Sequence, residues 1–109
     1  MLISIIIPCY NEKNTILKIL KKVKNQKINK QIIVIDDSST DGTTNILKKN
    51  FKKKGFKLIS HKKNLGKGAA IKSAKKFIKG NIVIIQDADL EYDPKDYRKL
   101  ILPIIKKKN

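Results

Sequence analysis

Residues 82–94, Ile-Val-Ile-Ile-Gln-Asp-Ala-Asp-Leu-Glu-Tyr-Asp-Pro, decide the fold of this chain. The β-branched first half is typical of a strand buried in a sheet, because such strands read as continuous apolar runs. The second half is acidic, since five of the nine carboxylates of the chain lie between Asp87 and Asp96. The sequence therefore predicts a strand that leaves the sheet directly into a group of negative charges.

The other four carboxylates also follow apolar runs. One comes after residues 2–7 and three come after residues 31–35: Glu12, Asp36, Asp37 and Asp41. Carboxylates that served only solubility would be spread over helix faces, as the lysines are. In parallel sheets, ligands bind beyond the carboxyl ends of the strands, and the acids are expected at those ends.

Strand and helix patterns alternate along the whole chain. Strands are expected at residues 2–7, ended by Pro8, at 31–35, at 57–60 near an edge of the sheet, and from 82. Helices are expected at residues 13–25, from the turn at 36–43 to Lys54, at 69–79, and from Pro94 with a kink at Pro103. This alternation with short connections indicates an α/β fold whose mainly parallel sheet is covered on both faces.

The composition bounds the class of protein. A chain of 109 residues is one domain, and its net charge is +17, with Arg98 as the single arginine among 26 basic residues. Such a charge favours phosphorylated partners, nucleic acid or an anionic membrane. Base readout and phosphate clamping depend on arginine, however, so no specific nucleic-acid partner is expected. Most of the lysines are expected to form solvated helix surface.

Cysteine and histidine are scarce. Cys9 is the only cysteine, which excludes an internal disulfide and favours a cytoplasmic setting, with the thiol buried beside Pro8. His61 is the only histidine and is expected on the surface, so no Ser-His-Asp arrangement is expected. No apolar run reaches the roughly 18 residues of a membrane helix, and the apolar start lacks a basic leader and a cleavage site.

Two acids after the fourth strand have the spacing of a cation site. Asp87 and Asp89 are two positions apart, so on an extended segment they point the same way, roughly 7 Å apart. This spacing suits one oxygen-binding cation, or a cation that bridges the pair to a phosphate. As an alternative, Asp89 or Asp93 caps the helix that begins near Pro94.

The glycine-containing loop at residues 64–68, Asn-Leu-Gly-Lys-Gly, is a weaker signal. It lacks a third glycine at the dinucleotide spacing and has no Walker lysine pattern, so its glycines could serve only a tight turn. Lys67 at a helix start could neutralise a diphosphate. With the Asp36-Asp37 pair able to accept from base N–H groups or ribose hydroxyls, a metal-bound nucleoside diphosphate fits all of these loops.

Four motifs occur in order along the chain: Pro8-Cys9-Tyr10-Asn11-Glu12, Asp-Asp-Ser-Ser-Thr-Asp-Gly-Thr at 36–43, the loop at 64–68, and Asp87-Ala88-Asp89. Together they resemble the motifs of family 2 glycosyltransferases, which have the GT-A nucleotide-diphospho-sugar transferase fold. The resemblance spans nearly the whole chain and implies a Rossmann-like three-layer sandwich. Residues 87–94 are further similar to the branch that transfers sugars to polyprenyl phosphate, such as dolichyl-phosphate mannosyltransferases.

The resemblance implies roles for individual residues. Six would contact the donor, with Asp37 at the base: Pro8, Tyr10, Glu12, Asp37, Lys67 and Asp87. Asp87 and Asp89 would hold Mg²⁺ or Mn²⁺ on the donor diphosphate. Glu91 falls where polyprenyl-phosphate transferases place a third ligand on the metal side.

The resemblance also implies a function. The chain would be the N-terminal donor-binding part of a transferase that uses a UDP- or GDP-linked sugar, with polyprenyl phosphate as the candidate acceptor and peripheral association with the cytoplasmic face of a membrane. Family members continue into an acceptor-binding half, so a truncated product or an incomplete reading of a longer one is expected, inactive or weakly active alone. The acceptor-side catalytic residues would then be absent from the chain.

Two other functions compete with this one. The first is a non-enzymatic, lysine-rich module that binds nucleic acid or an anionic membrane electrostatically. The second is a phosphohydrolase with Asp87 as nucleophile. It is disfavoured because that motif belongs on a first strand, with Thr or Val where Glu91 stands.

Overall fold

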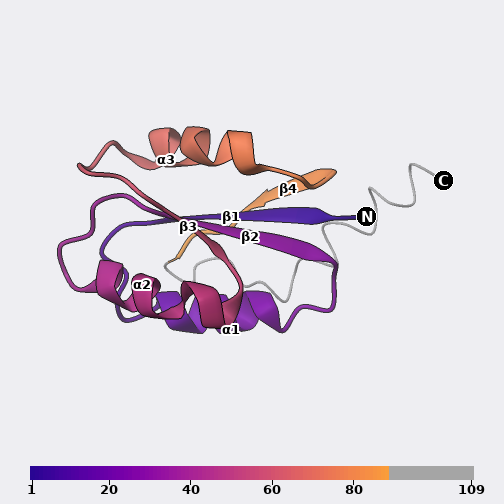
Figure 1. The fold of residues 1–109 in the computed structure, drawn as a ribbon, viewed down its shortest axis with the longest axis horizontal. Coiled ribbons are helices and arrows are strands. Elements are labelled where there is room, and N and C mark those ends of the chain that lie inside the picture. The colour runs from indigo at the N-terminus through magenta and orange to yellow at the C-terminus, as the bar shows by residue number, and fades with distance from the viewer. Residues whose placement is uncertain (89–109) are drawn as a thin grey trace.

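Residues 1–88 form a parallel four-stranded sheet with helices on both faces (Figure 1). The computed structural model describes residues 1–88, and the expected last helix lies outside them. The elements are β1 (Ile3–Cys9), α1 (Ile16–Lys24), β2 (Lys30–Asp36), α2 (Thr43–Lys54), β3 (Lys57–Ser60), α3 (Lys67–Ala74), a 3-10 turn (Lys75–Phe77) and β4 (Ile82–Ile85). All three strand pairings are parallel, which confirms the predicted α/β class.

Two apolar cores lie on opposite faces of the sheet. α1 and α2 cover one face and α3 covers the other, so the described chain has three layers (Figure 1). The core under α1 follows from helical spacing, since its four apolar residues recur at intervals of three or four positions and are fully buried: Ile16, Ile19, Leu20 and Val23. Under α3, Ala70 and Ala74 pack with Ile6 of β1.

The strand order β3-β2-β1-β4 creates a crevice beside β1. The chain adds β2 and β3 on one side of β1, and β4 then pairs on the other side. A switch of this kind opens space between the loops at the carboxyl ends of the strands, where parallel sheets bind ligands. Those loops gather on the left of Figure 1, and β3 lies at an edge as the sequence predicts.

Pro8 does not end β1, contrary to the prediction. β1 continues through Cys9, with Pro8 opposite Ile35 in the ladder. Alternate residues of a strand bond to opposite neighbours, and here the carbonyl of Ile6 accepts from the Gln86 amide on the β4 side. Pro8 faces that same side, where β4 has already ended, so its missing N–H costs no ladder hydrogen bond.

The bounds of α1 and α3 differ from those predicted. The first helix begins at Ile16 rather than residue 13, because the amides of Thr15 and Ile16 both bond to the carbonyl of Glu12 in a preceding turn. The third helix ends at Ala74 and tightens into the 3-10 turn. None of the helices within residues 1–88 has the length and apolar character that crossing a bilayer requires.

A buried polar cluster fixes the chain before β4. The hydroxyl of Ser4, which is fully buried, donates to Gln31 Oε1 at 2.7 Å and accepts from the Gly80 amide at 2.8 Å. Gln31 Nε2 donates to the carbonyl of Phe77 at 2.7 Å, which holds the end of the 3-10 turn. The close approach leaves no room for a side chain at residue 80.

Gly80→Ala tests this cluster. A Cβ at residue 80 would lie 2.6 Å from both the amide and the hydroxyl of Ser4 and 2.8 Å from the carbonyl of Leu2. We expect a loss of about 1–3 kcal/mol in the free energy of unfolding, as for other overpacked sites. Gly68→Ala is the control, because nothing lies within 4 Å of its Cβ. Urea unfolding should separate the two variants, and equal midpoints would contradict the account.

Candidate functional site

One pocket at the carboxyl ends of the strands contains all six residues that the sequence predicts for donor binding. It has a volume of about 180 Å³ and lies at the switch point between β1 and β4. Its walls are Pro8, Cys9, Tyr10, Glu12, Asp37, Lys67, Ala70, Asp87 and Ala88. The structure thus brings the predicted residues together from four separate loops, while their roles stay predictions.

The loops after β1 and β2 are joined by hydrogen bonds. Asn11, in the left-handed region at φ 52°, donates its amide to Ser39 Oγ at 3.0 Å and accepts from the Thr40 amide at 2.7 Å. The Glu12 amide donates to Thr43 Oγ1 at 3.0 Å. These contacts fix the loop that carries the β1 side of the pocket.

Asp36 belongs to the framework of its loop. Its side chain is buried, and Oδ1 accepts from the amide and the hydroxyl of Ser39 at 3.2 and 2.6 Å. Oδ2 accepts from the hydroxyl of Thr44. The expectation that both acids of the 36–37 pair face a nucleoside is therefore wrong for Asp36, and only Asp37 lines the pocket.

Asp37 accepts three hydrogen bonds although it is only 4% exposed. Oδ1 accepts from the Leu65 amide and from His61 Nδ1, both at 2.9 Å, and Oδ2 accepts from the Gly66 amide at 2.8 Å. Burial by itself raises the pKa of this carboxyl, but these donors outweigh it and leave the pKa below its ordinary value of 3.8. The carboxylate is therefore charged and held in place at neutral pH.

His61 is not a surface residue, contrary to the prediction. Its side chain is only 8% exposed, and Nε2 lies 2.7 Å from Ser73 Oγ while Nδ1 contacts Asp37. Because a carboxylate only accepts, Nδ1 carries the proton in the neutral ring and Nε2 accepts from the Ser73 hydroxyl. His61 follows β3 at the same sheet edge as the acids, and applying the strand-end rule to this residue would have placed it correctly.

The hydrogen bonds that run from Ser73 through His61 to Asp37 have the connectivity of a hydrolase triad, which was not expected from the sequence. Ser73 lies inside α3, where the neighbouring amides are engaged in helix hydrogen bonds, and it is not among the residues that line the pocket. A nucleophile needs free donors aimed at the developing oxyanion. These hydrogen bonds therefore link α3 and the loop after β3 to β2.

The backbone conformation at residue 66 favours glycine, whereas that at residue 68 does not. Gly66 has φ 96°, a region that favours glycine, and this orientation aims its amide at Asp37. Gly68 lies in the first turn of α3. Between them, the Lys67 ammonium pairs with Asp87 Oδ1 across the pocket mouth, with the two side chains 56% and 38% exposed.

Of the three predicted metal ligands, only Asp87 is among the described residues. Asp89 and Glu91 lie outside them, and residues 1–88 contain no group of three or more His, Cys, Asp or Glu side chains that could hold a metal ion. Asp87 has the oxygen donor that Mg²⁺ and Mn²⁺ prefer, and it already lies against a cationic group. Its surroundings therefore fit one ligand of the predicted site. The next residue is also held, since the Ala88 carbonyl accepts from Thr15 Oγ1 at 2.6 Å.

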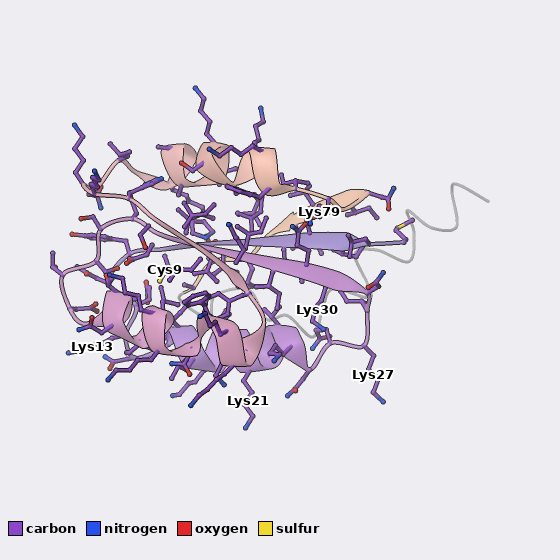
Figure 2. The ribbon with its side chains drawn as sticks, in the orientation of Figure 1. Cys9, Lys13, Lys21, Lys27, Lys30 and Lys79 are labelled. Atoms are coloured by element: carbon purple, nitrogen blue, oxygen red, sulfur yellow. The ribbon has the colours of Figure 1, made fainter. Side chains whose placement is uncertain are left out.

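Cys9 is buried, as predicted, between the sheet and the layer of α1 and α2 (Figure 2). Burial and the nearby carboxylates of Asp36, Glu12 and Asp41 raise the pKa of its thiol to about 12. The side chain is therefore an uncharged thiol at neutral pH, and it forms part of the pocket floor by packing.

Most lysines project away from the sheet, as Lys21 and Lys27 do in Figure 2. Lys30 differs, because its ammonium donates to the carbonyls of Lys24 and Gln26 at 3.0 and 2.8 Å at the end of α1. Burial and the charge of Lys24 lower the pKa of Lys30. The positive charge is thus spread over exposed surface, while the described carboxylates gather at the carboxyl edge of the sheet.

Comparison with known proteins identifies the family. Residues 4–109 match the family model described as Glycosyl transferase family 2. The chain belongs to glycosyltransferase family 2. This finding confirms the family that the four sequence motifs indicate.

Two curated relatives of this glycosyltransferase family 2 chain have related names. The undecaprenyl-phosphate 4-deoxy-4-formamido-L-arabinose transferase of Aeromonas hydrophila is 34% identical over 106 residues, which cover 92% of this chain and 32% of the relative. The dolichol-phosphate mannosyltransferase of Pyrococcus furiosus is 33% identical over 103 residues, which cover 93% and 29%. The chain therefore spans about a third of the length of these relatives.

Two solved structures share the fold of this glycosyltransferase family 2 chain. S. aureus TarS 1-349 in complex with UDP-GlcNAc has a TM-score of 0.81 at 27% identity, covering 97% of this chain and 32% of that TarS chain. The mannosyltransferase PcManGT from Pyrobaculum calidifontis, in complex with GDP-Man and Mn²⁺, has a TM-score of 0.72 at 29% identity, covering 80% and 27%. The predicted Rossmann-like GT-A fold is confirmed.

His61→Ala should destabilise the protein more than Ser73→Ala. Loss of the imidazole leaves a buried oxygen of Asp37 with one donor fewer, which costs about 1–3 kcal/mol. Ser73→Ala removes a donor from the outer ring nitrogen only, and we expect about 1 kcal/mol or less. Urea unfolding measures both values, and a larger loss for Ser73→Ala would contradict this account.

Acid should weaken the joined loops. Asp41 resembles Asp37, because burial raises the pKa of its carboxyl but hydrogen bonds from Thr43 and from the Lys13 amide lower the pKa below 3.8 overall. A lowered pKa contributes stability above the unfolded-state value of about 4, and this contribution is lost as pH falls through the folded value. The urea concentration at the midpoint of unfolding should therefore decrease as the pH is lowered below about 4. The midpoint of the Asp41→Asn variant, in which the amide oxygen still accepts from Thr43, should decrease less steeply as the pH is lowered. Parallel curves of midpoint against pH for the two proteins would contradict the assignment.

Proposed function

We propose that residues 1–109 form the N-terminal donor-binding part of a glycosyltransferase that takes its sugar from a metal-bound nucleoside diphosphate. The observation that carries the proposal is the pocket at the switch point, whose lining includes all six predicted donor-binding residues. Family membership and the nucleotide-sugar complexes of both structural neighbours support it.

The walls of the pocket divide by chemistry. Pro8, Tyr10 and Asp37 surround space for a nucleoside, with Tyr10 45% exposed and able to stack on a base. Lys67 and Asp87 form an ion pair at this pocket, and they come from the start of α3 and from the segment after β4. The diphosphate would lie beside Lys67, since an ammonium group and a helix N-terminus both favour negative charge.

Transfer of the sugar makes the nucleoside diphosphate the leaving group. Lys67 would place positive charge beside the departing phosphates, and Asp87, with Asp89, would hold Mg²⁺ or Mn²⁺ at the same place. When bound, the metal stabilises the charge that develops on the diphosphate. The short loops from β1 to α3 keep these groups in position before the donor arrives.

The acceptor proposed here is polyprenyl phosphate, at the cytoplasmic face of a membrane with which the protein associates peripherally. The names of the two curated relatives support this acceptor class. A phosphate is already a nucleophile, so such an acceptor needs little help from a general base.

Metal-dependent nucleotide binding tests the proposal. Calorimetry of the chain with UDP or GDP in the presence of Mn²⁺ should show binding that weakens at least about tenfold when the Mn²⁺ is chelated, because the cation bridges protein and diphosphate. Asp87→Asn and Asp89→Asn should each weaken Mn²⁺-dependent binding similarly.

Lys63→Gln is the control for this experiment. It alters an exposed charge in the loop before Lys67, outside the pocket, and should leave the affinity for nucleotide within about twofold. Nucleotide binding that ignores Mn²⁺ and both aspartate variants, and that falls steeply with salt, would favour the lysine-rich electrostatic module instead.

A further inference from the structure

We propose that Thr15 is a positioning residue for the segment at residues 86–88, which follows β4 and leads into the predicted metal ligands. The hydroxyl of Thr15 donates to the carbonyl of Ala88 at 2.6 Å, across 73 positions of sequence. This inference rests on the proposed function, because it takes Asp87 and Asp89 as ligands of the cation. It goes further by assigning a role to a residue that lies outside the four sequence motifs and does not line the pocket.

Thr15 stands at the position where a threonine side chain usually caps a helix. Such a side chain accepts a hydrogen bond from an amide in the first turn. The Thr15 hydroxyl makes no capping bond to α1. The start of the helix is ordered by the backbone instead, since the amides of Thr15 and Ile16 both donate to the carbonyl of Glu12. The side chain of Thr15 is therefore directed to the segment after β4 and not to its own helix.

The segment at residues 86–88 is where the sheet stops holding the chain. β4 ends at Ile85, and the Gln86 amide donates to the carbonyl of Ile6 at 2.8 Å. Side chains hold the two carbonyls that follow, because Gln86 Nε2 donates to that of Asp87 at 3.0 Å and Thr15 donates to that of Ala88. Ala88 is only 4% exposed and packs in the core under α1, so its carbonyl requires a donor from within the protein.

The contact restrains the backbone between the two predicted metal ligands. The Ala88 carbonyl belongs to the peptide group that joins Ala88 to Asp89, and Asp87 precedes it. Groups that are fixed in place before a cation arrives do not have to be ordered when it binds, and partners that orient metal ligands raise metal affinity for this reason. Loss of the Thr15 hydroxyl should therefore weaken the contribution of the cation while every predicted ligand is still present.

Thr15 also touches the other wall of the pocket. Its hydroxyl lies 2.9 Å from Glu12 Oε2, so two oxygens compete for the one proton that a hydroxyl carries. The contact with Ala88 is the shorter of the two. The experiment must therefore separate an effect on the segment at residues 86–88 from an effect on Glu12.

The experiment measures how much Mn²⁺ strengthens the binding of UDP and of GDP to the intact 109-residue chain. Calorimetry gives the nucleotide affinity with Mn²⁺ and with a chelator, and the ratio of the two is the gain from the metal. Thr15→Val keeps the branched shape and removes the hydroxyl. We expect this variant to lower the gain about three- to tenfold, as for the loss of one hydrogen bond, and to leave the affinity in chelator within about twofold.

Three further variants show whether the hydroxyl is responsible. Thr15→Ser keeps the hydroxyl and should restore the gain to within about twofold of the unaltered chain, whereas Thr15→Ala should lower it as Thr15→Val does. Agreement between these two variants excludes a packing defect peculiar to valine. Ser73→Ala is the matched control, because it removes a hydroxyl whose partner is His61 and which lies outside the pocket, and it should keep the full gain.

The outcomes separate the inference from the proposed function. An undiminished gain from Mn²⁺ in Thr15→Val and Thr15→Ala would overturn the inference and leave the proposed function standing. An equal loss of affinity with Mn²⁺ and with chelator would also overturn it, because the effect would then act through Glu12. If the unaltered chain binds neither nucleotide with Mn²⁺ present, the proposed function fails and the inference fails with it.

Discussion

The buried carboxylate of Asp37 is the interaction on which the site depends. It joins β2 to the loop between β3 and α3 through two successive amides, and to α3 through His61 and Ser73. A buried charge is costly unless it is fully hydrogen-bonded, so these donors and the carboxylate require one another. Because the amide of Gly66 is one of them, the same contacts set where α3 begins and therefore where Lys67 lies.

The strand order brings the other pocket residues to the sheet edge where Asp37 lies. β1 lies between β2 and β4, so the residues that follow all three strands come to one edge of the sheet. Negative groups collected there would repel one another, yet the described carboxylates each have donors or a cation close by. The rest of the surface is strongly basic, and such a surface raises the local concentration of anions around the protein.

Much of this arrangement follows from sequence alone. Continuous β-branched runs identified β1, β2 and β4, and the strand-end position of the acids identified the functional edge, because both signals are local. Pro8 was misjudged because tolerance of proline depends on which neighbour the residue faces, a property of the assembled sheet. The 3-10 end of α3 depends on Gln31, which is far away in sequence.

His61 and Asp36 show the same limit within the site. A lone histidine and an Asp-Asp pair carry no local sign of which group will be buried and which will face a ligand. The hydroxyls of Ser39 and Thr44 hold the Asp36 side chain in its buried position, and Asp37 and Ser73 do the same for the His61 side chain. These are choices of hydrogen-bond partner in three dimensions, and they become visible only once the loops are placed.

Asp37 accepts three hydrogen bonds from within the protein, so the orientation of its carboxylate is fixed by the fold. Asp37 cannot rotate without breaking contacts to the backbone of the loop that carries Lys67, so this group is preorganised in the pocket wall. The bonds that stabilise the loop thus also hold a charged group in the pocket wall. In this fold, one set of hydrogen bonds both orders the loop before α3 and fixes the position of that charge.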